Sequence, residues 1–158
     1  MAPPRLLADE MVGRLARYLR MMGADTVYVR GLADEEVLRI ARAEERVLLT
    51  RDRELARRSG RAVLLSSPRI EDQVRETWAA VPTLSRELRF DRCTLCNGRL
   101  SPVETPGPAD TIPGVPWGRV REGLVLYRCD GCRHLFWEGS HTEGVRRRLH
   151  AWSTESRP

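Results

Sequence analysis

Four cysteines stand in two closely spaced pairs, Cys93 with Cys96 and Cys129 with Cys132, and the chain has no other cysteine. Two Cys-x-x-Cys turns can direct four thiolates at one ion. A Cys₄ set is a tetrahedral structural site for Zn²⁺, because it leaves no open position for a reactive water. A redox dithiol, an iron–sulfur centre and four unligated thiols are the alternatives. The spacing favours zinc.

The glycines beside these pairs are part of the same prediction. Gly98 follows the first pair and Gly131 lies inside the second. We expect both to supply the unusual backbone angles that such turns often need.

Three aspartates follow three predicted strands. Asp9 comes directly after the first strand, Asp34 opens the helix after the second, and Asp52 follows the third. The carboxyl ends of parallel strands meet at one edge of a sheet, where α/β proteins bind ligands, so we expect these side chains to converge. Converging carboxylates repel one another unless a cation neutralises them. Mg²⁺ or Mn²⁺ takes such oxygen ligands and can activate water against a phosphodiester.

Each aspartate also has a simpler interpretation, because Asp is a favoured N-cap of the helix that follows a strand. Asp34, followed by two glutamates, is a good helix start with no other role. Glu10, Glu35 and Glu36 lie beside the three positions and could add a ligand.

The first half of the chain predicts an α/β domain, in which apolar strands alternate with amphipathic helices and Gly23 ends the first helix. Continuously apolar strands joined by helices indicate a parallel sheet covered on both faces. The expected strands are Arg5–Ala8, Thr26–Val29, Val47–Thr50 and Ala62–Leu65, and the expected helices are Met11–Met22, Asp34–Glu44, Asp52–Arg58 and Ile70–Trp78.

The second half changes character, because prolines and glycines interrupt residues 102–118. Such a segment builds little core, and the metal would supply the missing stabilisation. We therefore predict an α/β domain over residues 1–85, a zinc-ribbon lobe with a terminal helix over 86–152, and a frayed tail over 153–158. The terminal helix is expected at Thr142–Trp152, with Ser140 as its N-cap.

The formal net charge is +5, and every basic residue other than histidine is arginine. Arginine suits bidentate phosphate contacts, although a charge of this size supports nucleic-acid binding only weakly. No apolar run is long enough for a transmembrane helix, and the N-terminus lacks the apolar stretch of a secretory signal. A cytoplasmic protein is the default expectation, and nothing in the sequence specifies an oligomeric state.

Several basic and aromatic residues are candidates for contacts with RNA. Arg14, Arg17 and Arg20 recur every three residues on the first helix, and Arg51 precedes Asp52. His141 could contact a phosphate or protonate a leaving group. A solvated helix face and a surface histidine are the plainer interpretations. Arg146, Arg147 and Arg148 form a basic cluster on the terminal helix, and Arg133 and His134 lie beside the second cysteine pair. The aromatic residues around the ribbon are expected to pack against the zinc lobe or the α/β domain, although one exposed ring could stack on a base; they are Trp117, Tyr127, Phe136 and Trp137.

The motifs together resemble the Mut7-C RNase domain family, over residues 6 to about 150. The resemblance implies a PIN-like nuclease fold with a C-terminal zinc ribbon, and RNA cleavage with Mg²⁺ or Mn²⁺. Asp9 and Asp52 are then the strongest metal ligands, with Asp34 next. The matching segments are Leu7–Arg20 (LADEMVGRLARYLR), Gly23–Thr26 (GADT), Leu48–Leu55 (LLTRDREL), Cys93–Gly98 (CTLCNG) and Trp137–His141 (WEGSH).

The leading hypothesis is therefore a metal-dependent ribonuclease. A non-catalytic RNA- or ribosome-binding module is the second hypothesis. It is favoured by the lack of an evident fourth acid after the last strand, where Glu71 and Asp72 are shifted from the position that a PIN nuclease uses. A protein-interaction adaptor that uses the zinc lobe is the third.

Overall fold

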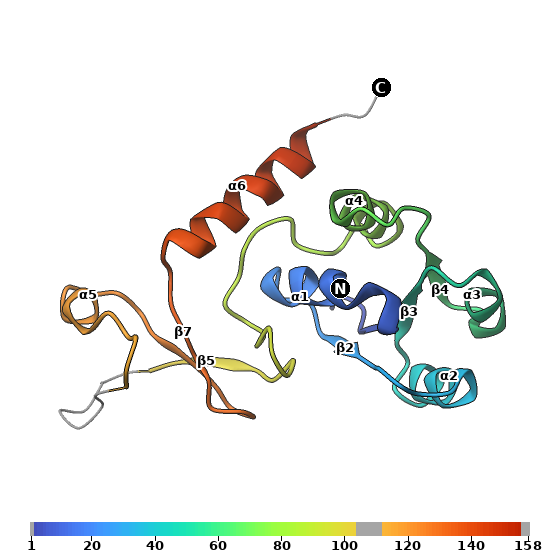
Figure 1. Cartoon of the computed structure of the whole chain (residues 1–158), viewed down its shortest axis with the longest axis horizontal. Coiled ribbons are helices and arrows are strands. Elements are labelled where there is room, and N and C mark those ends of the chain that lie inside the picture. Colours follow the sequence, from blue (N-terminus) through green and yellow to red (C-terminus); the bar gives the residue numbers. More distant parts are fainter. Residues whose placement is uncertain (1, 104–111, 156–158) are drawn as a thin grey trace.

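A four-stranded parallel sheet forms the centre of the first half of the chain (Figure 1). The computed structural model describes residues 2–103 and 112–155. The strands lie in the order β2-β1-β3-β4, so β1 is an inner strand that pairs in parallel with β2 and β3. The predicted α/β fold is confirmed. The strands are β1 (Leu6–Ala8), β2 (Thr26–Tyr28), β3 (Val47–Thr50) and β4 (Ala62–Leu64).

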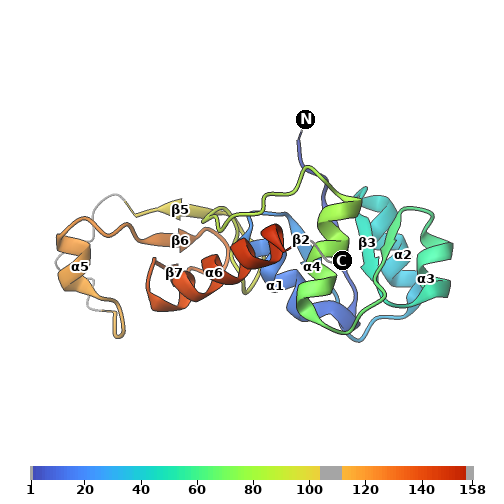
Figure 2. The same ribbon diagram turned by 90° about the horizontal axis from the view of Figure 1, so that it is seen from above.

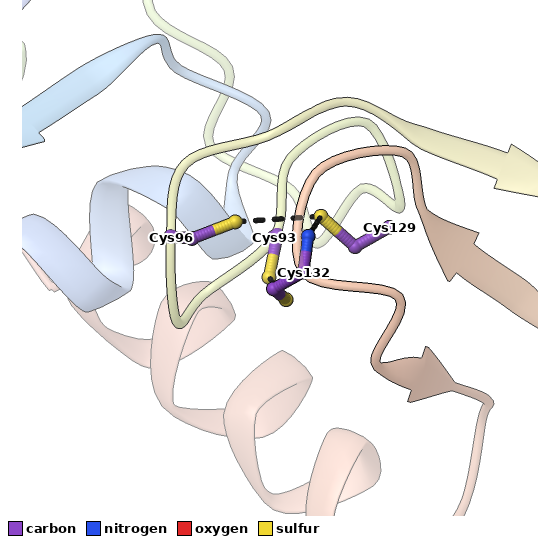
Figure 3. Close-up of side chains that lie close together, drawn as sticks. All are labelled: Cys93, Cys96, Cys129 and Cys132. Atoms are coloured by element: carbon purple, nitrogen blue, oxygen red, sulfur yellow. Dashed lines mark hydrogen bonds between the residues drawn. The ribbon is translucent and has the colours of Figure 1, made fainter.

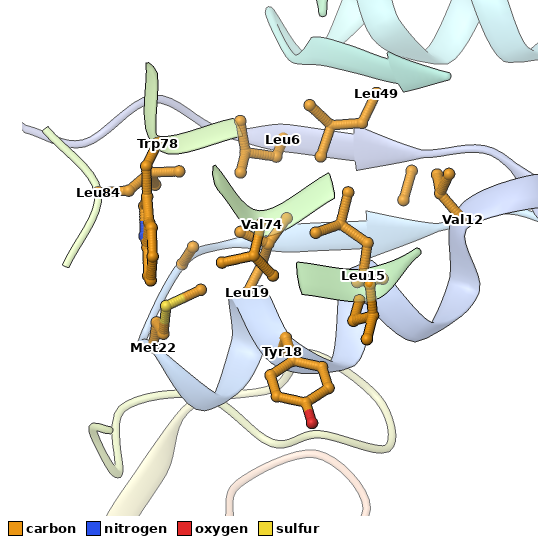
Figure 4. Close-up of a cluster of buried hydrophobic side chains, with 14 of the residues drawn as sticks. Leu6, Val12, Leu15, Tyr18, Leu19, Met22, Leu49, Val74, Trp78 and Leu84 are labelled. Carbon is orange, nitrogen blue, oxygen red and sulfur yellow. The ribbon is translucent and has the colours of Figure 1, made fainter. Parts of the chain in front are cut away.

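Helices cover both faces of this sheet, because successive side chains of its central strands point to opposite faces. Leu6 and Leu49 enter the larger core, whereas Leu7 and Leu48 enter the smaller one. Figure 4 shows the larger core, where Leu15, Leu19, Val74 and Trp78 meet the sheet. Helices α1 (Gly13–Met21) and α4 (Ile70–Ala80) line this core, and α2 (Asp34–Ala43) and α3 (Arg53–Ser59) line the smaller one.

The helix starts differ in detail from the prediction, and the differences concern the three aspartates. The first helix opens as a 3₁₀ turn, η1 (Glu10–Val12), which Asp9 caps. Asp52 is the N-cap of α3 rather than its first residue. Asp34 is the first residue of α2, and Ala33 occupies the cap position, so the Asp34 carboxylate is not used as a cap.

The second half forms a small antiparallel sheet with the order β5-β6-β7. Figure 2 shows this lobe at the opposite end of the molecule from α2 and α3, with α5 at its far tip. The antiparallel sheet and its cysteine turns give the lobe the predicted ribbon-like form. Its elements are β5 (Leu100–Pro102), α5 (Trp117–Arg121), β6 (Tyr127–Cys129) and β7 (Leu135–Phe136).

The terminal helix α6 (Ser140–Thr154) is longer than predicted at both ends. Gly139 is its N-cap, so the prediction for Ser140 is wrong by one residue, and part of the predicted frayed tail is helical. The apolar face of α6 packs on the larger core of the α/β domain, where the Tyr18 and Trp152 rings lie 5.1 Å apart. The predicted domain boundaries stay a prediction. No helix in the described parts of the chain combines the length and apolarity needed to cross a membrane.

Candidate functional site

The four cysteines converge, as their spacing predicts (Figure 3). All four Sγ atoms lie within 4.8 Å of one another. Two of these sulfur–sulfur distances are 3.4 Å for Cys96–Cys129 and 3.7 Å for Cys93–Cys132. Four sulfurs at about 2.3 Å from one Zn²⁺ would be about 3.8 Å apart in a tetrahedron, so the cluster has the size of a zinc site. Burial raises the pKa of the Cys93 thiol to about 12, so a cation has to displace this proton to bind the thiolate.

The two cysteine turns repeat one backbone pattern. The amide of Asn97 donates to the Cys93 carbonyl at 2.9 Å, and the amide of Arg133 donates to the Cys129 carbonyl at 3.0 Å. Both donors have φ of 67°. The prediction that glycines supply the left-handed angles is therefore wrong, because the residue directly after each pair supplies them.

Gly98 is required for a different reason. A Cβ atom at this position would lie 2.7 Å from the Cys129 Sγ, which is closer than real Cβ contacts. At Gly131 the nearest sulfur would be 3.5 Å away, an ordinary contact. The first glycine thus keeps space beside the sulfurs, and its amide donates to the Cys96 Sγ at 3.4 Å.

The first cysteine turn docks on the open edge of the parallel sheet. β2 is an edge strand, and its Thr26 amide donates to the Asn97 Oδ1 at 2.9 Å. Arg20 donates from Nε to the Thr26 carbonyl at 2.8 Å and from a terminal nitrogen to the Thr94 carbonyl at 3.0 Å. Arg20 is buried, so it does not belong to the predicted basic stripe. It links the two lobes instead.

Asp25 completes this junction. The Asn97 Nδ2 and a terminal nitrogen of Arg46 each donate to its Oδ1 at 2.8 Å. Burial alone would raise the pKa of the Asp25 carboxyl, but these hydrogen bonds and the charge of Arg46 together lower it. Asp25 therefore stays ionised and anchors the cysteine turn through Asn97.

The predicted aspartates line one pocket at the carboxyl edge of the sheet. Asp9, Asp34 and Asp52 share its wall with Glu10, and no arginine or histidine lines it within the described residues. The pocket has a volume of about 90 Å³. This volume is enough for an ion with a few water molecules but is small for an organic ligand, since pockets for such ligands usually exceed about 300 Å³.

Asp9 is the most buried acid of this pocket, with 6% of its surface exposed. Its Oδ1 accepts the Met11 amide at 3.0 Å, and its Oδ2 accepts the Thr50 hydroxyl. The Thr50 Oγ1 in turn accepts the amide of Asp52 at 2.9 Å, so one hydroxyl ties both aspartates together. Burial raises the pKa of Asp9, the two hydrogen bonds oppose this, and the charges of Asp52 and Glu10 add to the rise.

The other acids differ in how strongly they are held. The Oδ1 of Asp52 accepts a hydrogen bond from the Leu55 amide at 2.9 Å, which caps the helix. Asp34 is half exposed and lies 3.7 Å from a terminal nitrogen of Arg58. Glu10 accepts the Gly31 amide at 3.1 Å. Its place in the pocket makes Glu10 the best of the three adjacent glutamates to add an oxygen.

The other acids that the sequence offered as possible metal ligands make ion pairs or hydrogen bonds outside the pocket. Glu35 pairs with Arg58 and Glu36 pairs with Arg39. In α4, Glu71 pairs with Arg69, and Asp72 accepts the Ser67 hydroxyl at 2.8 Å, while neither lines the pocket.

The pocket offers the hard oxygen donors of a Mg²⁺ or Mn²⁺ site, and the pKa of Asp9 is raised there first by burial and then by the charges of Asp52 and Glu10. The carboxylate oxygens of this pocket lie too far apart to bind one ion together. In residues 2–103 and 112–155, the four cysteines are the only group of three or more His, Cys, Asp or Glu side chains that lie close enough to share an ion. The acids would therefore have to rotate closer together to hold a cation.

The predicted substrate-binding residues are distributed over the molecule. Arg14 is exposed on α1 and lines neither the acidic pocket nor the cavity that Arg17 and His141 line. The Nε of Arg51 is buried without a hydrogen-bond partner among the described residues. Arg17 and His141 line a second cavity, between α1, the ribbon and α6, rather than the acidic pocket.

Two polar residues that matter here were not singled out from the sequence. Thr50 is a fully buried polar residue at the end of an apolar strand, and this contrast is a signal that could have identified it. Asn97 gives no comparable signal, because its partner Thr26 lies on an element distant in sequence.

Comparison with known protein families identified a match over most of the chain. The family described as Mut7-C RNAse domain matches residues 4–149, and this range includes the aspartates and all four cysteines. No curated protein and no solved structure matches the chain.

Proposed function

Because this chain belongs to the Mut7-C RNase domain family, and membership implies a ribonuclease acting on RNA, we propose that it cleaves phosphodiester bonds with Mg²⁺ or Mn²⁺ at the acidic pocket. The observation that carries the proposal is the common pocket of Asp9, Asp34 and Asp52. These three residues follow three different strands, and they lie at the edge where parallel sheets bind ligands.

In this proposal Asp9 and Asp52 hold the cation, and Asp34 adds a third carboxylate. A bound Mg²⁺ or Mn²⁺ would supply an activated water and neutralise charge on the phosphate. Thr50 positions both stronger ligands through its single hydroxyl. Asp52 keeps its Oδ2 free of the capping bond that occupies its Oδ1. Asp34, being half exposed, can turn toward substrate or cation.

We assign the remaining predicted residues to supporting roles. The four cysteines hold one Zn²⁺, which is structural because the protein supplies all four ligands. Arg14 contacts the RNA backbone from the exposed face of α1, and Arg51 does so beside Asp52. Arginine suits this role because its guanidinium matches phosphate geometry.

The test is cleavage of a single-stranded RNA in the presence of Mn²⁺. Asp9→Asn and Asp52→Asn should each lower the cleavage rate at least about 100-fold, because loss of a metal ligand removes several kcal/mol of transition-state stabilisation. Glu54→Gln is the matched control, since Glu54 is an acid on the same helix as the Asp52 cap but pairs with Arg57 outside the pocket. Equal activity in all four proteins would reject the proposed site.

A second candidate function is RNA binding without cleavage. It is favoured by the separation of the pocket carboxylates and by the engagement of Glu71 and Asp72 elsewhere. Salt-dependent RNA binding without turnover, unchanged by both aspartate substitutions, would establish it in place of the ribonuclease.

A further inference from the structure

A groove runs between the two lobes, separate from the acidic pocket. One cavity of about 250 Å³ is bounded by α1, by the segment over residues 88–95, by the ribbon and by α6. A second cavity of about 290 Å³ continues it along the ribbon. The two share Phe90, Phe136, His141 and Thr142, so they form one groove. Figure 2 shows that α6 leaves the ribbon and runs back toward the α/β domain.

The charge of this groove is opposite to that of the acidic pocket. Three arginines and two histidines line the first cavity, and no aspartate or glutamate does so among the described residues. Arg89 is paired with Asp91, and Arg92 lies 3.8 Å from Asp25. Arg17 has no ion pair in the described structure and is exposed on α1. Its positive charge is therefore available to an anionic ligand.

Aromatic rings supply the apolar part of the wall. Phe90 is stacked on Tyr127, with ring centroids 4.6 Å apart and planes at 13°, so Tyr127 supports it. Phe136 lies 4.8 Å from the His134 ring at a tilt of 60°. Phe136 and Phe90 each line both cavities, while Trp137 lines the second.

We propose that this groove binds a base of single-stranded RNA, with Phe136 as the stacking surface and Arg17 at the neighbouring phosphate. The proposal rests on the proposed function only in taking RNA as the ligand. An aromatic surface beside uncompensated positive charge is the combination that binds single strands without reading their sequence. The apolar wall and the size of the groove suit a planar base, whereas the acidic pocket is too small for one.

The position of the groove relative to the acidic pocket sets the length of strand that can use both. Met11, in η1 and two residues before the start of α1, lines the acidic pocket, and Met21, the last residue of α1, lines the groove. A nine-residue helix is roughly 14 Å long, at 1.5 Å per residue. A stacked strand advances about 3.4 Å per nucleotide, so about four nucleotides separate the two sites.

The experiment measures fluorescence anisotropy of a labelled ten-nucleotide single-stranded RNA and of the same sequence as a duplex. The full chain is used with no added Mg²⁺, Mn²⁺ or chelator, so the RNA stays intact and zinc is retained. Phe136→Leu keeps an apolar side chain but removes the ring, and should weaken single-strand binding about 5- to 100-fold. Arg17→Gln should reduce the slope of log affinity against log salt by about 0.7.

Arg147→Gln is the matched control, because Arg147 is exposed on α6 and lines neither cavity. It should bind single strands like the wild type. Single-strand affinities of Phe136→Leu and Arg17→Gln equal to that of Arg147→Gln would overturn the proposal, and so would equal or tighter binding of the duplex.

A photocrosslinking measurement covers the case in which Phe136→Leu fails to fold. Wild-type protein crosslinked to RNA that carries 4-thiouridine should yield modified peptides around Phe90, Phe136 or His141. Crosslinks confined to the acidic edge of the sheet would overturn the groove. Cleavage is assayed separately with Mn²⁺: cleavage without groove binding leaves the ribonuclease standing, and groove binding without cleavage leaves the groove standing.

Discussion

The acidic pocket and the groove between the lobes are opposite in almost every physical respect. The pocket is small, is lined by four carboxylates and carries no basic side chain among the described residues. The groove is larger and carries arginine, histidine and aromatic side chains with no acid in its first cavity. Carboxylates in a small space attract a cation, while rings beside arginines attract a nucleotide. Under the two proposals, the pocket is the place for phosphodiester chemistry and the groove is the place that holds the strand.

The two sites also differ in what builds them. Strand ends and helix starts of one domain place the pocket acids, so the pocket depends on the parallel sheet alone. The groove takes one wall from the ribbon and another from α1 and α6. Its shape therefore depends on the cysteine cluster and on the junction made by Arg20 and Asn97.

The largest expected effect comes from removing the zinc. A structural zinc supplies on the order of 10 kcal/mol to a lobe of this size. Cys132→Ser, or treatment of the wild type with a strong chelator, should unfold the ribbon and remove groove binding while the parallel sheet stays folded. Hydrogen exchange should show lost protection in β6 and at Asn97 but retained protection in β1 and β3.

The control is the addition of zinc, which should restore the chelated wild type but not Cys132→Ser. Retained protection in β6 after zinc loss would show that the groove does not depend on the metal. Loss of protection in β1 and β3 as well would show that the two lobes unfold as one cooperative unit, and would contradict the claim that the pocket depends on the parallel sheet alone.

A divalent cation should act on the pocket and leave the groove unchanged. At about 100 times its Kd, a ligand that binds only the folded state raises the free energy of unfolding by about 2.7 kcal/mol. For a chain of this length, the Tm should then rise by roughly 5–10 °C with Mn²⁺. Differential scanning fluorimetry of the wild type and Asp9→Asn measures the effect, which should be absent in the variant.

The pH dependence of this Tm shift follows from Asp9. The cation binds the ionised carboxylate, and burial raises the pKa of Asp9 above its ordinary value of 3.8. The stabilisation by Mn²⁺ should therefore be complete above this raised pKa and disappear as the pH falls through it. Glu54→Gln should respond like the wild type. An undiminished Mn²⁺ effect in Asp9→Asn would place the cation outside the pocket.

The pocket was largely predictable from the sequence because it depends on local patterns. Apolar runs fixed the strands to within one residue at each end, and topology then required Asp9, Asp34 and Asp52 to meet at one edge. The paired cysteine spacing likewise predicted the cluster. Each inference needed only short-range periodicity or spacing, together with the rule that parallel strands share an orientation.

The groove was not predictable, because its residues meet only after the lobes dock. Arg17 and His141 were expected only as separate candidates for contacts with RNA, and the structure brings them together in the groove. Arg20 was expected on a basic face, but it is buried against carbonyls of a distant segment. Helical spacing shows that side chains share a face, but it does not show what covers that face.

The smallest expected effect tests whether the junction shapes the groove without touching the pocket. Asn97→Gly keeps the left-handed backbone but removes the acceptor of the buried Thr26 amide and one donor to Asp25, which should lower the free energy of unfolding by about 1–2 kcal/mol. Arg133→Gly is the matched control at the equivalent position of the second turn. There φ is also 67° and the Arg133 side chain makes no hydrogen bond to the residues that the structure describes, so a change to glycine should be neutral or slightly stabilising. Urea unfolding measures both variants.

Single-strand RNA affinity should fall in Asn97→Gly, while the Mn²⁺-dependent rise in Tm should stay at the wild-type value. A reduced Mn²⁺ response in Asn97→Gly would mean that the junction couples the two sites, and that the lobes do not act independently on the RNA.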